Sequence, residues 1–383
     1  MKIVLAPDKF KGSLTAAAVA DAMAAGVRRA LTDTTIDACP IADGGEGFVE
    51  TMIRANGGEL ITRKVTGPLP EMKVEAAFGV MPAEGGRPRT AVIEMAAAAG
   101  LALLKPAERD PMRTTSFGVG ELMRAAIDLG CRRILLGIGG SATVDAGIGC
   151  AQATGHTIVL QDGEPVSPTE PLVGADLERV VMVKRHRGEV TDGVEIIVAC
   201  DVTNPLAGPN GAAPIFGPQK GATPEQVEQL DSWLRRLAIS NGKQLEADTP
   251  GAGAAGGLGF GLLAYFGAKL VSGIELVLDA TRLAERLKGA DLCLTGEGRL
   301  DGQSAGGKAV LGVAKLCKAA GVPCIALVGG VDAGAEATHA AGLTSYFSIC
   351  DRPMSLDDAI AHAPALLARS AEQVVRTVIS RRT

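Results

Sequence analysis

Aromatic residues and histidines are scarce in this chain of 383 residues. Phe, Tyr and Trp together make up only 3% of it, which disfavours an all-β sandwich and favours an α/β enzyme whose apolar mass lies in Ala, Val, Leu and Ile. The four histidines, His156, His186, His339 and His362, show no mutual metal spacing. A zinc site built on histidine and a Ser-His-Asp triad are therefore both disfavoured.

Paired cysteine motifs and membrane segments are missing as well. The eight cysteines contain no C-x-x-C pair, and most fall inside apolar runs, so we expect no soft-metal cluster and reduced thiols in a cytoplasmic protein. The N-terminus lacks the pattern of a signal peptide. The longest stretch without a charge, between Asp248 and Lys269, contains seven glycines and a proline and predicts a loop and a buried helix, with no membrane span.

Positive charge is also in slight deficit. Lys and Arg number 38 against 43 Asp and Glu, a formal net charge of −5, which disfavours a protein that binds nucleic acid through its phosphates. The hydrophobic fraction of 47% excludes a disordered chain. The partners expected are small molecules, and the sequence leaves open a homodimer.

Apolar runs of strand length alternate with helical patterns, the rhythm of a parallel sheet. A helix capped by Ser13 or Thr15 should follow the first strand, and a capping box at Thr223 should begin another that runs to about Ser240. Further helices are expected up to Asn56, at Lys308–Ala320 and in the tail. The expected strands are Lys2–Ala6, Ile36–Ala42, Arg132–Ile138, Glu195–Cys200, Asp291–Thr295 and Pro323–Val328.

The segment from about residue 68 to residue 88 interrupts this rhythm, and the chain from there to about residue 279 has strands and helices of its own. We therefore expect two domains: a discontinuous α/β domain of residues 1–68 and 280–383, and an α/β domain of residues 69–279 inserted into it.

Polar loops follow several predicted strands, where parallel sheets gather functional groups. In the first loop, Asp8, Lys9 and Lys11 precede a helix and could hold a carboxylate or a phosphate, although lysines in a loop also simply face water. In the second, the glycines between Asp43 and Gly47 would let a ligand approach closely. Its carboxylates could bind a metal, accept a hydroxyl proton or only cap a helix.

Three later loops are open to more than one interpretation. The segment Gly137–Ala142 has the outline of a dinucleotide fingerprint, but a phosphate-binding loop with Ser141, Thr143 and the nearby Asp145 fits better. Lys308 has P-loop spacing, yet Ala309 stands where magnesium needs a hydroxyl. The run from residue 200 to 221 is either a rigid site or a long surface loop. With no nucleophilic triad, phosphoryl transfer fits this inventory best.

Several long segments of the sequence match the motifs of one known family. They are "APDKFKGSLTA" at the start, "IADGGEG" at Ile41–Gly47, "VTGPL" at Val65–Leu69, "IEMAAAAGL" at Ile93–Leu101, "ERDPMRTTSFGVGEL" at Glu108–Leu122, "GIGGSATVDAGIG" at Gly137–Gly149, "ACDVTNPLAGPNGAAPIFGPQKGA" at Ala199–Ala222, "PGAGAAGGLGFGL" at Pro250–Leu262 and "TGEGRLDGQSAGGKA" at Thr295–Ala309. Through these segments the sequence resembles the bacterial glycerate kinases over essentially its whole length.

The resemblance implies a Rossmann-like α/β domain with a second domain inserted, an active site in the cleft between them, and transfer of phosphate from ATP to D-glycerate with Mg²⁺, giving 2-phosphoglycerate. Asp43 would accept the hydroxyl proton. Candidates for holding the glycerate carboxylate and the transferring phosphoryl group are Lys9, Lys11 and Arg299. Further substrate or phosphate contacts would come from Asp8, Gly44, Gly45, Gly139, Gly140, Ser141, Thr143, Asp145 and Lys308, and magnesium ligands from Asp201, Asn204 and Asp301.

The sequence departs from the family pattern at three positions. Lys9 stands where the family commonly has Ser, Val144 where it has Asn, and Ala146 where it has Gly, so the loop beside Asp145 could bind its ligand with altered geometry. The alternatives kept are a kinase that gives 3-phosphoglycerate or uses another small hydroxy acid, an NAD-dependent hydroxy-acid oxidoreductase, and a glycerate sensor without catalysis.

Overall fold

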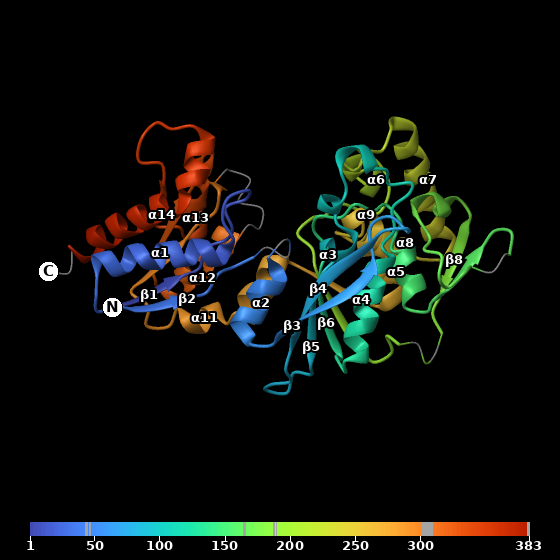
Figure 1. Ribbon diagram of the computed structural model, residues 1–383, viewed down its shortest axis with the longest axis horizontal. Coiled ribbons are helices and arrows are strands. Elements are labelled where there is room, and N and C mark those ends of the chain that lie inside the picture. The colour runs from blue at the N-terminus through green and yellow to red at the C-terminus, as the bar shows by residue number, and fades with distance from the viewer. Residues whose placement is uncertain are drawn as a thin grey trace. The chain divides into compact units, whose positions relative to one another are not determined.

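The computed structural model describes residues 1–42, 45, 47–163, 166–186, 188, 190–300 and 309–380. The chain forms two compact units, each with its own sheet (Figure 1). Unit 1 consists of Met1–Asp43, Arg54–Asn56 and Ile274–Thr383, and unit 2 of Gly44–Ile53 and Gly57–Gly273.

Unit 1 contains a five-stranded sheet in the order β15-β13-β11-β1-β2. All four neighbouring pairs run parallel, so the carboxyl ends of the strands share one edge. The pairing of β1 with β11 joins chain segments almost 290 residues apart in sequence. The strands are β1 (Lys2–Leu5), β2 (Thr35–Ala38), β11 (Leu292–Thr295), β13 (Cys324–Val328) and β15 (Ser345–Ser348).

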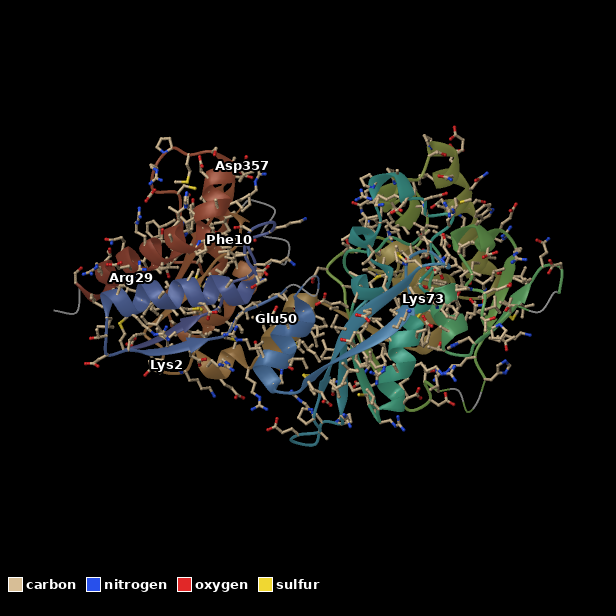
Figure 2. All side chains as sticks on the ribbon, in the orientation of Figure 1. Lys2, Phe10, Arg29, Glu50, Lys73 and Asp357 are labelled. Carbon is tan, nitrogen blue, oxygen red and sulfur yellow. The ribbon has the colours of Figure 1, made fainter. Side chains whose placement is uncertain are left out.

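Two long helices, α1 (Ala16–Ala30) and α14 (Leu356–Ile379), lie side by side against one face of this sheet (Figure 1). Thr15 caps α1, its hydroxyl accepting a hydrogen bond from the Ala18 amide at 3.2 Å. Val19, Met23 and Val27 are fully buried, as their helical spacing predicts. The core continues to Phe10 in the loop after β1, labelled in Figure 2.

The helix α12 (Ala309–Ala320) contacts β11 and β13 on the opposite face. Its side chains meet strand residues that alternate with those of the core shared with α1 and α14. There the sulfur atoms of Cys293, Cys317 and Cys324 lie within 4.8 Å of one another. The structure thus brings three thiols together where the sequence predicts no soft-metal cluster. The three come from β11, α12 and β13, so tertiary packing brings them together without any spacing that a sequence could show. All eight cysteines are free thiols, and most are buried.

Unit 2 contains a six-stranded sheet in the order β10-β9-β6-β5-β4-β3. The four strands from β10 to β5 are parallel, while β4 runs antiparallel to both of its neighbours. The strands are β3 (Glu59–Thr66), β4 (Lys73–Met81), β5 (Thr90–Glu94), β6 (Arg133–Gly137), β9 (Glu195–Ala199) and β10 (Lys269–Val271).

The antiparallel strand explains two differences from the sequence analysis. The segment that interrupts the parallel rhythm around residues 68–88 is β4, paired with β3 along its whole length. Because β3 belongs to this sheet, the boundary of unit 2 lies before β3, near residue 57, and not at residue 68. Only Gly57 and Gly58 separate α2 (Phe48–Asn56) from β3, so no linker composition marks this boundary.

Helices pack around the second sheet and complete its core. The capping box at Thr223 begins α7 (Pro224–Ser240) as predicted, and the charge-free stretch contains the buried helix α9 (Ala254–Phe266). The others are α2 (Phe48–Asn56), α3 (Ala96–Ala99), α4 (Phe117–Asp128), α5 (Ile148–Ala153), α6 (Ala212–Phe216) and α8 (Gln244–Asp248), beside a small antiparallel pair, β7 (Thr157–Leu160) and β8 (Val180–Lys184).

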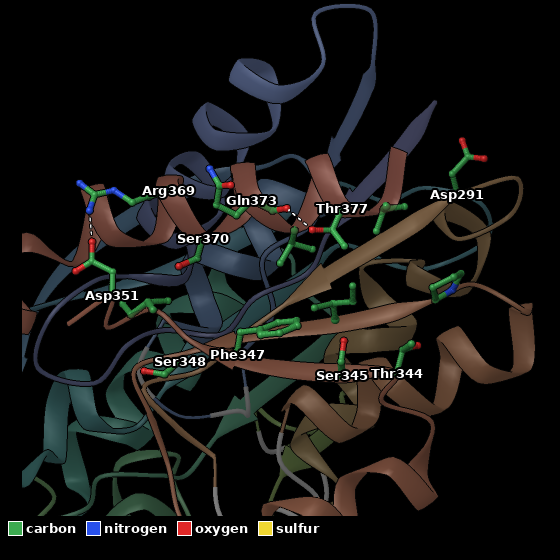
Figure 3. A pocket seen from close by; sticks show the side chains of 15 residues that line it. Asp291, Thr344, Ser345, Phe347, Ser348, Asp351, Arg369, Ser370, Gln373 and Thr377 are labelled. Carbon is green, nitrogen blue, oxygen red and sulfur yellow. Dashed lines mark hydrogen bonds and ion pairs between the residues drawn. The ribbon is translucent and has the colours of Figure 1, made fainter. Parts of the chain in front are cut away.

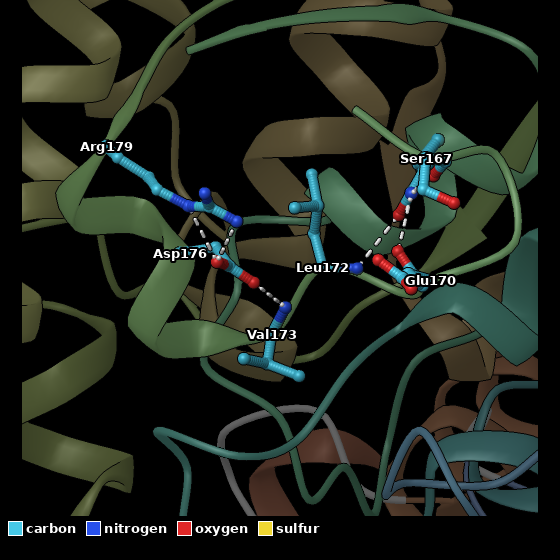
Figure 4. Close-up of polar contacts among 7 residues, drawn as sticks. Ser167, Glu170, Leu172, Val173, Asp176 and Arg179 are labelled. Carbon is cyan, nitrogen blue, oxygen red and sulfur yellow. Dashed lines mark hydrogen bonds and ion pairs between the residues drawn. The ribbon is translucent and has the colours of Figure 1, made fainter. Parts of the chain in front are cut away.

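The segment after β7 is tied back to α5 by one side chain (Figure 4). The Gln152 amide nitrogen donates to the carbonyls of Ser167 and Glu170 at 2.7 and 2.9 Å, and its oxygen accepts from the Leu172 amide. A few residues on, Asp176 accepts from the Val173 amide and pairs with Arg179. The segment after β7 is thereby fixed to α5, the helix that follows the Gly139–Asp145 segment. Within the part of the chain described, no helix has the length and hydrophobicity that crossing a bilayer requires.

Candidate active site

In unit 1 the loops after β1 and β11 are held together by their main chains. The Asp8 amide donates to the Gly296 carbonyl at 2.8 Å. The loop after β11 is in turn joined to the loop after β13, where the Gly330 amide donates to the Gly298 carbonyl at 3.1 Å. Three strand ends thus form one rigid edge, as expected for a parallel sheet.

The charged side chains on this edge differ in exposure. Asp8 is 8% exposed, and its carboxylate accepts a hydrogen bond from the Lys9 amide at 2.7 Å. Lys11 is exposed, and so is Arg299, which forms an ion pair with Asp332. Lysine and arginine heads at the end of a parallel sheet can bind a carboxylate or a phosphate. Of the expected unit 1 contacts, Lys9, Lys11 and Arg299 therefore suit an anion, while Asp8 braces the loop.

In unit 2 the loops at the carboxyl ends of β5 and β6 converge. Gly139 and Gly140, directly after β6, are exposed. A Cβ atom added to Gly139 would lie 3.3 Å from the Cα of Gly45, so the structure brings two of the predicted glycine loops together. Glu94, the last residue of β5, accepts a hydrogen bond from the Val49 amide at the start of α2. Gly140 has φ of +74°, a conformation that favours glycine.

Asp145 lies beneath this loop and not at its surface. Its carboxylate is fully buried and accepts hydrogen bonds from the amide and the hydroxyl of Ser116 at 2.8 and 2.7 Å and from the Gly147 amide at 3.1 Å. Burial raises the pKa of Asp145, and these hydrogen bonds partly oppose the shift. The expectation that Asp145 contacts a ligand is therefore corrected, since its oxygens are engaged in fixing the loop.

Lys220 is a charged residue that the sequence analysis missed. It ends the short segment η4 (Pro218–Lys220), its side chain is 2% exposed, and its Nζ donates to the Ser141 hydroxyl and the Thr143 carbonyl, both at 2.7 Å. Burial lowers the pKa of Lys220 to about 7, while the Asp145 carboxylate acts to raise it. The only signal in the sequence was its place in the proline- and glycine-rich run from residue 200 to 221.

The two hydroxyls expected on the phosphate differ. Ser141 is 8% exposed, whereas Thr143 is fully buried and its Oγ1 has no partner among the described residues. Two positions that depart from the family pattern, Val144 and Ala146, lie beside Asp145 in the sequence. Both side chains are fully buried in the core of unit 2. Ala146 has φ of +51°, which explains why glycine suits this position. These two side chains shape the core and do not face a ligand.

The segment Gly137–Ala142 does not have the architecture of a dinucleotide site. Such a site needs a helix that starts directly at the glycine loop, with its N-terminus on the pyrophosphate. Here α5 begins only at Ile148, after a further loop that turns around Asp145. This arrangement leaves the glycine amides as the groups that can meet a ligand.

Asp201 and Asn204 follow β9 at the same edge of the sheet. Asp201 is exposed, and one of its oxygens accepts hydrogen bonds from the Gly273 amide at 2.8 Å and the Ser272 hydroxyl at 3.1 Å. The Asn204 amide nitrogen donates to the Asn210 carbonyl. Both residues present oxygen atoms, the donors that Mg²⁺ prefers. The remaining candidates, Asp43, Gly44, Asp301 and Lys308, lie outside the described residues.

A cavity of about 720 Å³ lies elsewhere in unit 1, between α14 and the edge strand β15 (Figure 3). Phe347, Gln373 and Thr377 line it, and the ion pair between Asp351 and Arg369 stands at one end. None of the candidate residues at the strand ends contributes to this cavity. The cavity is therefore distinct from the candidate loops at the strand ends of unit 1.

Comparison with known proteins now adds to this geometry. A sequence model of the glycerate kinase family matches residues 3–379. The chain belongs to the glycerate kinase family. Among curated relatives, a glycerate kinase of Halalkalibacterium halodurans is 44% identical over 97% of both chains. The glycerate 2-kinase of Escherichia coli is 42% identical over 99% of this chain and 98% of its own.

A solved structure agrees with these relatives of the glycerate kinase family. The crystal structure of a putative glycerate kinase 2 from Salmonella typhimurium has a TM-score of 0.85 and 42% identity, covering 100% of this chain and 99% of its own. The resemblance and the α/β class predicted from the sequence are thereby confirmed. Family membership also sets aside the oxidoreductase alternative, in agreement with the structure of the Gly137–Ala142 segment.

Proposed function

We propose that this chain transfers the γ-phosphoryl group of ATP to a hydroxyl of D-glycerate, giving 2-phosphoglycerate and ADP. The observation that carries the proposal is the Gly139–Asp145 loop, which presents exposed glycine amides and rests on the buried charges of Asp145 and Lys220. Backbone amides on a rigid support suit a phosphate group. The family of the chain identifies ATP and glycerate as the substrates.

Both substrates are anions, and the exposed cations of unit 1 match them. Lys11 and Arg299 project at the strand ends, and Lys9 precedes the buried anchor Phe10. Phosphoryl transfer depends on positioning and on stabilisation of the charge that spreads over the transferring group. We therefore assign these three cations to the glycerate carboxylate and the phosphoryl group.

Magnesium is part of the proposal. Our candidates for magnesium ligands are Asp201, Asn204 and Asp301, because Mg²⁺ is commonly bound by one or two carboxylates along with substrate phosphates and waters. The second carboxylate oxygen of Asp201 and the amide oxygen of Asn204 are chemically suited to that role. When bound, the ion would neutralise charge on the ATP phosphates.

Asp43 is our candidate for the base that accepts the hydroxyl proton of glycerate. Replacing it with Asn removes the proton acceptor while keeping the shape, and we expect turnover to fall by roughly 100-fold or more. The measurement is ADP release at saturating substrates, with thermal unfolding as the control for folding. Near-normal turnover in a well-folded Asp43→Asn protein would assign the base elsewhere.

The reaction itself is tested by incubating the purified protein with ATP, Mg²⁺ and D-glycerate and resolving the products by phosphorus NMR. We expect 2-phosphoglycerate alone. A signal from 3-phosphoglycerate would reassign the acceptor hydroxyl, and turnover only with another hydroxy acid would reassign the substrate. Binding of glycerate without any turnover would instead indicate a sensor.

A further inference from the structure

The buried ammonium of Lys220 is costly for the fold. Its side chain is 2% exposed, and Asp145 is the charged group whose field acts on it. Removing an ammonium from water carries a penalty of several kcal/mol, roughly, and apolar residues of similar volume often replace buried ions without loss of stability. Because a methionine would fill the same space more cheaply, the charge points to a role other than stability.

The hydrogen bonds of Lys220 set the polarity of the loop above it. By donating to the Ser141 oxygen, the ammonium occupies an acceptor position of that hydroxyl, so the hydroxyl's own hydrogen is available to a ligand. No acceptor for this hydrogen occurs among the described residues. Ser141 lies next to the exposed glycines, so its hydroxyl can donate where the glycine amides do.

The second hydrogen bond of Lys220 acts on the main chain. The ammonium pulls the Thr143 carbonyl inward, and in a planar trans peptide the next amide N–H, that of Val144, points the opposite way. The described residues offer no hydrogen-bond acceptor to the amides of Gly139, Gly140 and Ser141. The loop therefore turns its donors outward and a carbonyl toward the buried charge.

Backbone geometry places Lys220 for this purpose. Gly221 follows it with φ of +94°, and a Cβ atom there would lie 2.1 Å from the Arg109 carbonyl oxygen, so only glycine fits. A Cβ atom on Gly256 would meet the Thr143 carbonyl oxygen at 1.9 Å, so the start of α9 packs against the same oxygen that accepts from Lys220. Lys220 and the start of α9 thus both contact the loop at this carbonyl, and Lys220 provides the charge there.

We propose that Lys220 is a positioning residue that holds the Ser141–Thr143 segment with its hydrogen-bond donors facing a substrate phosphate. It acts through Ser141 and the loop amides and does not touch the substrate. The inference deepens the proposed function, because it assumes that this loop receives a phosphate group of ATP or of the phosphorylated product.

The experiment compares Lys220→Met with the wild type by titration calorimetry, using ADP and 2-phosphoglycerate as separate ligands. Methionine keeps the length of the side chain but removes the charge and its donors. We expect the dissociation constant of at least one ligand to rise about 10-fold or more, since hydrogen bonds to charged groups have that magnitude. Unchanged constants for both ligands would overturn the proposal.

A matched control makes the same substitution elsewhere in unit 2. Lys73 on β4, labelled in Figure 2, is exposed and donates to the Thr66 hydroxyl, and Lys73→Met should leave both constants unchanged. A Ser141→Ala variant should weaken binding because it removes the hydroxyl through which Lys220 acts. Lys220→Met should therefore raise the dissociation constants less in the Ser141→Ala background than in the wild type. Full additivity of the two losses contradicts an action through Ser141.

A lack of cooperative unfolding would reveal that the Lys220→Met protein has lost its fold. In that case Ser141→Ala is the test: binding weaker by about 5-fold or more supports the proposal, and unchanged binding overturns it. Failure of the proposed function would show differently, as a wild-type protein that binds neither ligand or makes no phosphoglycerate.

Discussion

The candidate loops of the two units carry their charges in opposite ways. In unit 1, Lys11 and Arg299 are exposed at the ends of the parallel strands, and the loops are held mainly by main-chain hydrogen bonds. In unit 2 the charged groups, Asp145 and Lys220, are buried beneath a loop whose surface is glycine. Exposed charges are available to ligands at little cost in stability, whereas buried charges are committed to the fold around them.

This difference separates binding from positioning. A group that meets a mobile anion must be reached from solvent, so its removal should reduce activity and leave the fold intact. Replacing a buried charged group that orients a loop should change binding, because the loop loses the hydrogen bonds that hold it. It should also change stability, which falls where a second buried charge is left uncompensated and does not fall where the costly charge itself is removed. The variants below test this division, from the largest expected effect to the smallest.

The largest effect is expected from Asp145→Asn. Asparagine has the same shape but no charge, so the variant leaves Lys220 buried without its countercharge and weakens the hydrogen bonds from Ser116. Leaving a buried charge uncompensated typically costs about 3–5 kcal/mol of unfolding free energy. Urea denaturation measures this loss of unfolding free energy. A loss below about 1 kcal/mol, which is typical of surface charges, would mean that the buried charges of unit 2 matter no more for stability than the exposed ones of unit 1.

Arg299→Ala tests the exposed side of the comparison. We expect kcat/KM for glycerate to fall about 100-fold, because an arginine fork to an anion contributes roughly 1.5–3 kcal/mol. The unfolding free energy should change by less than about 0.5 kcal/mol, since the ion pair with Asp332 is exposed. Lys105→Ala, an exposed lysine of unit 2 outside both loops, is the control. A destabilised Arg299→Ala protein of normal activity would reverse the assignment.

The pH dependence of stability gives a third test. The pKa of Lys220 is lowered to about 7 in the folded protein and returns to an ordinary lysine value on unfolding, so above pH 7 the unfolded chain binds more protons at this group. The unfolding free energy of the wild type relative to Lys220→Met should therefore rise with pH, by at most about 1.4 kcal/mol per unit.

Ligand affinity should move the other way over the same range, because deprotonation removes the buried charge beneath the loop. Above pH 7 we thus expect greater relative stability together with weaker binding of ADP or 2-phosphoglycerate. Urea denaturation and calorimetry at matched pH values measure the two trends. If relative stability and ligand affinity both rise with pH, Lys220 has only a structural role.

Much of this arrangement could be predicted from local sequence signals. Thr15 and Thr223 predicted their helices because caps are local chemistry, and the loops after the strands carried the candidate residues because parallel sheets gather them there. The resemblance to glycerate kinases identified the family directly. Each of these signals lies within a short stretch of chain.

What could not be predicted depends on contacts between distant segments. Lys220 lies 77 residues from the carbonyl it holds, and a lysine in a polar loop is ordinarily exposed. Asp145 is a residue type that commonly binds ligands, and the sequence around it gives no sign that it is buried. Only the structure shows that its carboxylate is buried. The cysteines 293, 317 and 324 approach through three separate elements. Burial and long-range pairing decide these roles.

The smallest effect is expected from Ala146→Gly, which restores the family residue. The change relieves a left-handed conformation that costs roughly 1–2 kcal/mol, but it removes a buried methyl group of about 0.8 kcal/mol and adds roughly 0.4–1 kcal/mol of chain entropy to the unfolded state. These contributions nearly cancel, so urea denaturation should show a change within about 0.5 kcal/mol.

The affinity for ADP and 2-phosphoglycerate should also stay the same in Ala146→Gly, because the Ala146 side chain is fully buried in the core of unit 2. Calorimetry decides this second part. A change of more than about threefold in either dissociation constant would mean that the buried side of the loop controls its binding surface without any change of charge. The separation between exposed groups that bind and buried charges that position would then be too simple.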